Sequence, residues 1–153
     1  MEKFRPEIKD LPQTMWRVEQ VVFEDHKDQI TKLIKSCKLS TDYSHLGETW
    51  FIVKKDSKIV GCATIETREN LVHIQSLSVS EDMRKKGIAR SLVEAIYEKC
   101  VNPGQTLIAM TLFWNNPIYR SLGFEHLDPG LKKADDVGGR EKHKYCVVWG
   151  KSK

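Results

Sequence analysis

The part of the chain that most directly suggests chemistry is a basic segment with a glycine, Arg84-Lys85-Lys86-Gly87-Ile88-Ala89. It lies between the apolar run Leu71 to Val79 and the amphipathic stretch Ile88 to Cys100, so we expect a strand, a turn and then a helix. Backbone N–H groups and the positive end of the helix dipole would point at one spot there. Gly87 and Ala89 keep that spot open, and the three cations add positive charge. The segment therefore predicts a binding site for a phosphate or pyrophosphate.

A second block, Tyr119-Arg120-Ser121-Leu122-Gly123-Phe124, follows downstream. The stretch from Pro117 to Leu122 predicts a short helix that ends at Gly123, a residue typical of helix termination. Tyr119 then lies on this helix, five positions before Phe124. A basic turn alone is most often a solvated loop, and this one is neither a P-loop nor a dinucleotide-binding fingerprint. The two blocks together are more specific than either one.

In this combination the chain resembles the GCN5-related N-acetyltransferase (GNAT) family, over about Trp16 to Trp149. That family has an Arg/Gln-x-x-Gly-x-Gly/Ala turn after a central strand, and later a Tyr five positions before the Phe of a Gly-Phe pair. The resemblance implies a single acetyltransferase-like domain over residues 1–153, and the two prolines and mixed charges of residues 1–13 predict an irregular N-terminal arm. The implied fold is α/β, with a mixed, mostly antiparallel central sheet flanked by helices. The implied function is an acetyl-CoA-dependent N-acetyltransferase that acts on a primary amine of a small molecule or protein.

The resemblance also assigns residues that hold acetyl-CoA. The turn from Arg84 to Ala89 would bind the pyrophosphate, and the backbone of Leu77, Ser78 and Val79 would hydrogen-bond the pantetheine arm as an added strand. A backbone N–H of this strand could also face the thioester oxygen. Many relatives have an Asn seven positions before the Tyr, where this chain has Leu112. We expect Asn115 or Asn116 to supply that contact from a shifted position.

Two side chains are predicted to move protons. Tyr119 would protonate the leaving thiolate, because a phenol with a pKa of about 10 is protonated at neutral pH. His73, eleven residues before Arg84, occupies the position where relatives place a Glu or a His base. Direct deprotonation of an ammonium by His73 would be uphill by roughly 4 pKa units, so a relay through water or a weakly basic amine is expected. Glu66 and Glu69 are competing bases.

The acceptor cannot be identified from the sequence. By resemblance it would be held by residues 37–48 and 128–144, and these two segments carry charges of both signs. Neither a polyamine nor a carboxylate is excluded.

Length and composition narrow the classes of protein to which this chain can belong. The 153 residues fit one domain with a real core, and no apolar run approaches the roughly 20 residues that span a membrane. The N-terminus lacks a signal-peptide core, so we expect a cytoplasmic protein without a membrane partner, with a homodimer as an open alternative. Four scattered cysteines without a C-x-x-C pair argue against zinc and disulfides, so no metal is expected. The net charge of +4 is too mild to indicate nucleic acid.

Two other classes of function compete with the enzyme. The first is a non-catalytic acyl-CoA-binding or regulatory module on the same fold, which Tyr119 disfavours because a pure binder needs no acid. The second is a nucleotide- or nucleic-acid-binding domain, which lacks support because no aromatic residues are interleaved with the basic turn.

Hydrophobic periodicity predicts the order β-α-β-β-β-α-β-α-β-β. The expected strands are Trp16–Val21, Trp50–Val53, Ile59–Ile65, Val72–Val79, Leu107–Phe113, Phe124–Leu127 and Tyr145–Trp149. The expected helices are one capped by Asp25 that ends near Cys37, another over Gly87–Cys100, and the short one over Pro117–Leu122, with a further helical turn at Ser40–Leu46. Asp56-Ser57-Lys58 predicts a hairpin turn, and Asp128 to Lys144 a long charged loop.

Overall fold

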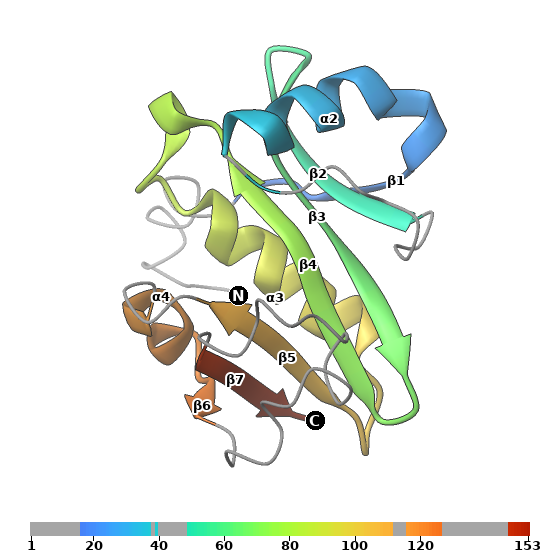
Figure 1. Ribbon diagram of the computed structural model, residues 1–153, viewed down its shortest axis with the longest axis vertical. Coiled ribbons are helices and arrows are strands. Elements are labelled where there is room, and N and C mark those ends of the chain that lie inside the picture. The colour runs from blue at the N-terminus through green and yellow to red at the C-terminus, as the bar shows by residue number, and fades with distance from the viewer. Residues whose placement is uncertain (1–15, 38, 40–48, 112–115, 127–146) are drawn as a thin grey trace, which may run out of the picture. The chain divides into compact units, whose positions relative to one another are not determined.

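The computed structural model describes residues 16–37, 39, 49–111, 116–126 and 147–153 (Figure 1). The strands are β1 (Glu19–Val22), β2 (Thr49–Lys55), β3 (Lys58–Arg68), β4 (Leu71–Val79), β5 (Thr106–Thr111), β6 (Glu125–His126) and β7 (Val147–Ser152). The helices are η2 (Phe23–His26), α2 (Lys27–Ser36), η3 (Glu81–Met83), α3 (Ile88–Cys100) and α4 (Asn116–Ser121). The predicted order of strands and helices is confirmed for these residues, and the Ser40–Leu46 turn and the 128–144 loop lie outside them.

The strands form one mixed sheet in the order β1-β2-β3-β4-β5-β7-β6. Four of the recorded pairs, β1–β2, β2–β3, β5–β7 and β6–β7, are antiparallel, and β4–β5 is parallel. The α/β fold with a mostly antiparallel sheet is therefore confirmed. Packing divides the chain into two compact units, with β3, β4 and α3 contributing to both. Unit 1 comprises Met1–Thr64 and Ser76–Ala95, and unit 2 comprises Ile65–Gln75 and Ile96–Lys153.

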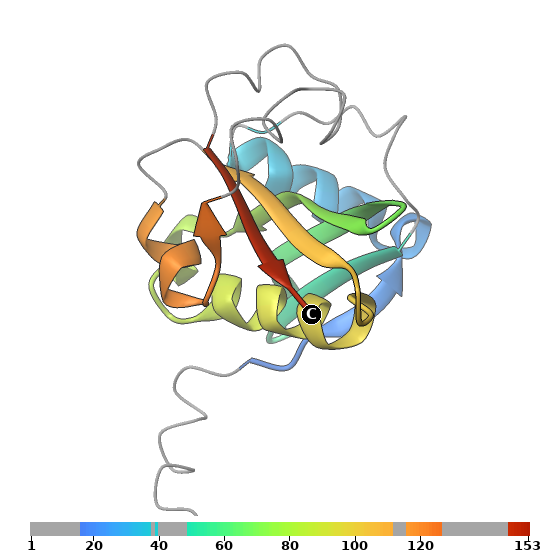
Figure 2. The ribbon, with the colours of Figure 1, turned by 90° about the horizontal axis from the view of Figure 1, so that it is seen from below.

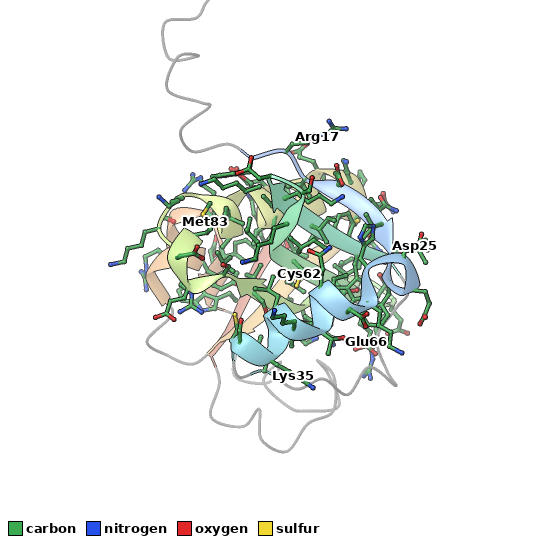
Figure 3. The ribbon with its side chains drawn as sticks, turned by 90° about the horizontal axis from the view of Figure 1, so that it is seen from above. Arg17, Asp25, Lys35, Cys62, Glu66 and Met83 are labelled. Atoms are coloured by element: carbon green, nitrogen blue, oxygen red, sulfur yellow. The ribbon has the colours of Figure 1, made fainter. Side chains whose placement is uncertain are left out.

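In unit 1 the sheet carries a helix on each face. Figure 2 shows α2 on one side of the strands and α3 on the other. The core under α2 is apolar and buried, and Figure 3 shows Cys62 inside it while Asp25 and Lys35 lie at the surface. Its members are Ile30, Leu33, Ile34, Trp50, Ile52, Ile59 and Cys62. Each fully buried side chain of this kind contributes roughly 1.5–3 kcal/mol.

On the other face, α3 approaches β3 at a glycine. A Cβ built on Gly61 would lie 2.5 Å from Cγ2 of Ile88 and 3.3 Å from Cδ1 of Leu92. A larger residue at position 61 would therefore push away the first turns of α3, which follow directly on the basic turn.

Two predicted boundaries in unit 1 are wrong. No side chain caps α2, because the 3₁₀ turn Phe23–His26 precedes it and Asp25 is exposed within that turn. The first strand begins at Glu19 and not at Trp16, because Trp16 makes hydrogen bonds elsewhere. The predicted β2–β3 hairpin is confirmed: Asp56 and Ser57 both have positive φ, 53° and 70°, as a type I′ turn requires.

In unit 2, β5 pairs with β7 over six residues, from Thr106↔Ser152 to Thr111↔Val147. This pairing extends β7 three residues past the predicted end at Trp149. The Oη of Tyr97 on α3 donates to the carbonyl of Ser152, and Nζ of Lys151 lies 4.4 Å from the Tyr97 ring centroid. Strand β7 therefore contacts α3 as well as its neighbours in the sheet. Along the described parts of the chain, no helix has the length and apolar character needed to cross a membrane.

Candidate active site

The basic turn has an unusual backbone. Lys85 and Gly87 both have positive φ, 64° and 87°, while Lys86 between them does not. A left-handed lysine costs roughly 1–2 kcal/mol relative to an ordinary conformation, so the surrounding structure must hold it there. Alternation of right- and left-handed residues lets successive N–H groups converge into an anion-binding concavity. The positive φ values of Lys85 and Gly87 are compatible with such a concavity at this turn.

The turn continues into a helix N-terminus. The N–H of Ser91 donates to the carbonyl of Gly87 at 3.0 Å, which is the first bond of α3. The N–H groups of Ile88, Ala89 and Arg90 precede that bond and have no partner within the helix. The Ile88 side chain is buried, so its backbone is what it offers to a ligand.

Trp16 holds the turn from outside. Its indole Nε1–H donates to the carbonyl of Lys86 at 2.8 Å, and its backbone N–H donates to Oγ of Ser91 at 2.9 Å. The peptide that joins Lys86 to Gly87 is trans, so the N–H of Gly87 points opposite to that carbonyl. By fixing the carbonyl, Trp16 fixes the direction of the Gly87 N–H. Nothing in the sequence pattern marked Trp16 as part of the site.

Arg84 differs from its two basic neighbours. Its Nε donates to the carbonyl of Val79 at 3.1 Å, and its Nη2 donates to Sγ of Cys37 at 3.5 Å. The Cys37 thiol in turn donates to the same Val79 carbonyl at 3.5 Å. The guanidinium thus links the end of β4 to the end of α2, although Arg84 is exposed like Lys85 and Lys86.

The strand before the turn contains a kink at Ser76, whose φ is 57°. The Ser76 carbonyl accepts hydrogen bonds from Oγ of Ser78 at 3.1 Å and from Sγ of Cys62 at 3.9 Å. A left-handed residue inside a strand redirects the backbone groups that follow it, here those of Leu77, Ser78 and Val79. The regular alternation of side chains between the two faces of β4 is therefore interrupted at Ser76.

In unit 2, β4 and β5 separate early. Their parallel pairing runs from Leu71↔Thr106 to His73↔Ile108, while β5 stays paired with β7 as far as Thr111. Within the described part of unit 2, no β4–β5 pair follows His73↔Ile108. A strand edge without a partner offers free N–H and C=O groups to an extended ligand.

The predicted base lies in a chain of polar side chains. Nε2 of Gln75 lies 3.3 Å from Nδ1 of His73 and donates to Oε1 of Glu66 at 2.9 Å. Nε of Arg68 lies 3.5 Å from the other carboxylate oxygen of Glu66. His73 is 7% exposed, and Oε1 of Gln75 is buried without a partner in the described structure. The structure thus brings His73 and Glu66 together through Gln75, whereas Glu69 lies in the β3–β4 turn with a φ of 52°.

Tyr119 lies at the end of α4, in a Schellman motif. The N–H of Phe124 donates to the Tyr119 carbonyl at 3.1 Å, and the N–H of Gly123 donates to the Arg120 carbonyl at 3.1 Å. Gly123 has the left-handed φ of 90° that this motif needs. The Tyr119 ring is 5% exposed and stacks on Trp149. Burial raises the pKa of its phenol well above the ordinary value, so the hydroxyl stays protonated.

Some predicted site residues lie outside the described residues, namely Asn115 and nearly all of the two acceptor segments. Asn116 is the first residue of α4. Among the residues that the structure does describe, no group of three or more His, Cys, Asp or Glu side chains could hold a metal ion.

Comparison with known families defines the class of this protein. The model of the acetyltransferase (GNAT) domain matches residues 46–126, which is more than half of the chain. The matched segment includes the kinked strand, the basic turn and the Tyr119–Phe124 helix end. The chain therefore belongs to the GNAT acetyltransferase family.

Solved structures share the fold at low sequence identity. N-acetylglutamate synthase from Neisseria gonorrhoeae, complexed with coenzyme A and N-acetyl-glutamate, aligns with a TM-score of 0.71 and 16% identity over 88% of this chain. This chain spans only 35% of that protein. Rv2747 from Mycobacterium tuberculosis, in complex with CoA, aligns with a TM-score of 0.69 and 13% identity, over 90% of this chain and 99% of that one. Naa50 from Arabidopsis thaliana, in complex with the bisubstrate analogue CoA-Ac-MVNAL, gives 0.66 and 19%, over 89% and 99%.

Proposed function

We propose that this protein is an acetyl-CoA-dependent N-acetyltransferase that acts on a primary amine. The observation that carries the proposal is the turn before α3, where Lys85 and Gly87 are left-handed and the helix N-terminus follows immediately. This backbone suits a pyrophosphate, and the relatives above include proteins whose structures contain CoA.

The cofactor would be held mainly by backbone groups. The pyrophosphate would accept hydrogen bonds from the N–H groups of residues 86–89, with Lys85 and Lys86 adding charge at the rim. The pantetheine arm would pair with the backbone of Leu77, Ser78 and Val79, which the kink at Ser76 has redirected. An N–H after this kink is our candidate for the group that stabilises the oxyanion of the tetrahedral intermediate.

The acceptor amine must lose a proton before it attacks the thioester. The polar chain of Glu66, Gln75 and His73 supports a role in taking up that proton, since it holds a carboxylate and an imidazole within hydrogen-bonding reach of one amide. Because His73 is nearly buried, a water molecule is the expected link between the amine and these groups.

Tyr119 would assist departure of the thiolate. Transfer of its proton to an alkyl thiolate with a pKa near 8.5 was already uphill for an ordinary phenol, and burial widens that gap. We therefore propose that the Tyr119 hydroxyl donates a hydrogen bond to the developing negative sulfur and that water completes the protonation. This role needs a neutral phenol, which burial supplies.

The experiment that tests the proposal is a thiol-release assay with acetyl-CoA, screened over amino acids, polyamines and peptide N-termini. Turnover with any amine class supports the enzyme. Tight acetyl-CoA binding without turnover on any of them would favour the second candidate, an acyl-CoA-binding module, which the backbone geometry of the turn alone would also serve.

A further inference from the structure

The orientation of the Gln75 amide has a consequence for His73. Nε2 of Gln75 is 2.9 Å from Oε1 of Glu66, and Glu66 also forms an ion pair with Arg68. An ionised carboxylate only accepts hydrogen bonds, so the amide must present its NH₂ group to it. The reversed amide would place two oxygens in contact and lose a hydrogen bond to a charged group, which contributes about 1.5–3 kcal/mol. Glu66 therefore fixes which way Gln75 points.

The same NH₂ group is 3.3 Å from Nδ1 of His73. An amide nitrogen has two hydrogens and accepts none, so the second N–H donates to Nδ1. Nδ1 must then carry a lone pair, and the proton of the neutral imidazole is on Nε2. If Nδ1 carried a proton, the N–H of His73 and the N–H of Gln75 would face each other as two donors with no acceptor between them.

The arrangement leaves one polar atom unsatisfied. Oε1 of Gln75 is buried without a hydrogen-bond partner in the described structure. Such an orphaned acceptor costs roughly 1–3 kcal/mol, so the amide is held in this orientation against a local penalty.

We propose that Gln75 is a positioning residue, set by Glu66, that holds His73 as a neutral imidazole with its proton on Nε2. His73 then does not take up the proton in the reaction proposed above, on which this assignment of roles rests, and the proposal assigns that role to Glu66, the other group that Gln75 links. The ammonium of the acceptor loses one proton, through water, and the Glu66 carboxylate gains it. His73 acts as a hydrogen-bond donor through Nε2–H.

The test is ¹⁵N NMR of the histidine ring nitrogens in the full chain without any ligand, with the His73 signals assigned by their loss in His73→Gln. In the unsubstituted protein at neutral pH, we expect a proton-bearing Nε2 and a bare Nδ1 whose signal is shifted by an accepted hydrogen bond. Gln75→Leu should remove that shift. Gln75→Glu, which replaces the donor by an acceptor, should move the proton to Nδ1.

The role of Glu66 needs its own variant. Glu66→Gln lets the Gln75 amide take either orientation, so the Nδ1 signal should move toward a mixture of bare and protonated forms. Glu69→Gln removes the same charge from the same hairpin and should leave the His73 signals unchanged. A proton on Nδ1 in the unsubstituted protein would overturn the proposal, as would an Nδ1 signal that Gln75→Leu leaves unmoved. Because the NMR measurement uses no cofactor, its outcome does not depend on whether the protein proves to be an acetyltransferase.

Discussion

The rings of Tyr119 and Phe124 meet edge to face, with centroids 5.2 Å apart, directly across the turn at Gly123. This contact joins the C3 and C″ positions of a Schellman motif, where an apolar pair commonly accompanies the hydrogen bonds. The spacing of the Tyr, Gly and Phe residues is thus explained by helix termination alone. What termination leaves unexplained is the Tyr119 hydroxyl, and the chemical role rests on that atom.

Substitution Tyr119→Phe separates these two roles. The ring contacts with Phe124 and Trp149 are kept, so the free energy of unfolding should change by less than about 1 kcal/mol. Turnover should fall about 100-fold, with unchanged affinity for acetyl-CoA, because only the hydroxyl is lost. Steady-state kinetics and calorimetry measure both effects, and unchanged turnover would leave Tyr119 with packing only.

The left-handed glycine at the helix end should matter for stability. A Cβ at Gly123 would make only ordinary contact with Lys151, 3.5 Å away, so Gly123→Ala should cost about 1–2 kcal/mol through backbone strain. Gly104→Ala is the matched control, since Gly104 has the same φ of 90° and open space around it. Urea denaturation should show similar losses for both. A much larger loss of stability for Gly123→Ala would show that the Schellman motif contributes more than backbone strain accounts for.

The backbone turn should be sensitive to added bulk and charge. Gly87→Glu places a carboxylate where the pyrophosphate is proposed to bind, on a residue with a φ of 87°. Acetyl-CoA affinity, measured by calorimetry, should fall strongly in a variant that remains folded by circular dichroism. Equal affinity in that folded variant would place the cofactor elsewhere.

Trp16 provides a finer test of the same turn. Trp16→Phe keeps an aromatic ring and removes the indole N–H that holds the Lys86 carbonyl. One net hydrogen bond contributes about 0.5–1.5 kcal/mol, so the dissociation constant of acetyl-CoA should rise by about 2- to 10-fold. Ser91→Ala removes the other hydrogen bond of Trp16, leaves the Lys86 carbonyl bound, and should have the smaller effect. A larger effect of Ser91→Ala than of Trp16→Phe would show that orientation of the Gly87 N–H does not explain the change in acetyl-CoA affinity.

The two candidate bases predict different pH profiles. If Glu66 takes the proton, kcat/KM should rise with pH through an acid inflection, because the carboxylate must be ionised to accept it. Glu66→Gln should abolish this inflection and lower kcat/KM by about 100-fold, whereas His73→Gln should lower the rate and keep the inflection. A profile in which His73→Gln alone removes the lower inflection would return the role of base to His73.

Cys62 gives a stability prediction with a defined sign. Burial raises the pKa of its thiol from 9.0 to about 12, so the unfolded chain loses this proton at lower pH than the folded protein does. Its contribution is complete below pH 9, and stability should then fall by about 1.4 kcal/mol per pH unit up to about pH 12. The unfolding free energy of Cys62→Ala should fall less steeply over the same window. Parallel curves for the two proteins would mean that the thiol titrates alike in both states.

Sequence patterns predicted the parts of this protein that depend on local chemistry. The basic turn, the helix that follows it and the glycine that ends α4 were all apparent, because glycine spacing and hydrophobic periodicity are local signals. Ser76 gave no such signal, since serine has no preference for a left-handed φ and the kink is held by Ser78 and Cys62. Contacts between distant residues were equally hidden, including those of Trp16 with the turn.

The Arg84 guanidinium has a consequence for protein engineering. It joins the Val79 carbonyl, at the end of the strand proposed to bind pantetheine, to the Cys37 thiol, at the end of α2. Residues from 37 onward are also where the family resemblance places recognition of the acceptor. A variant selected for a new acceptor through a change at Cys37 should therefore also disturb the cofactor strand. We expect such variants to change in substrate range and in acetyl-CoA affinity at the same time.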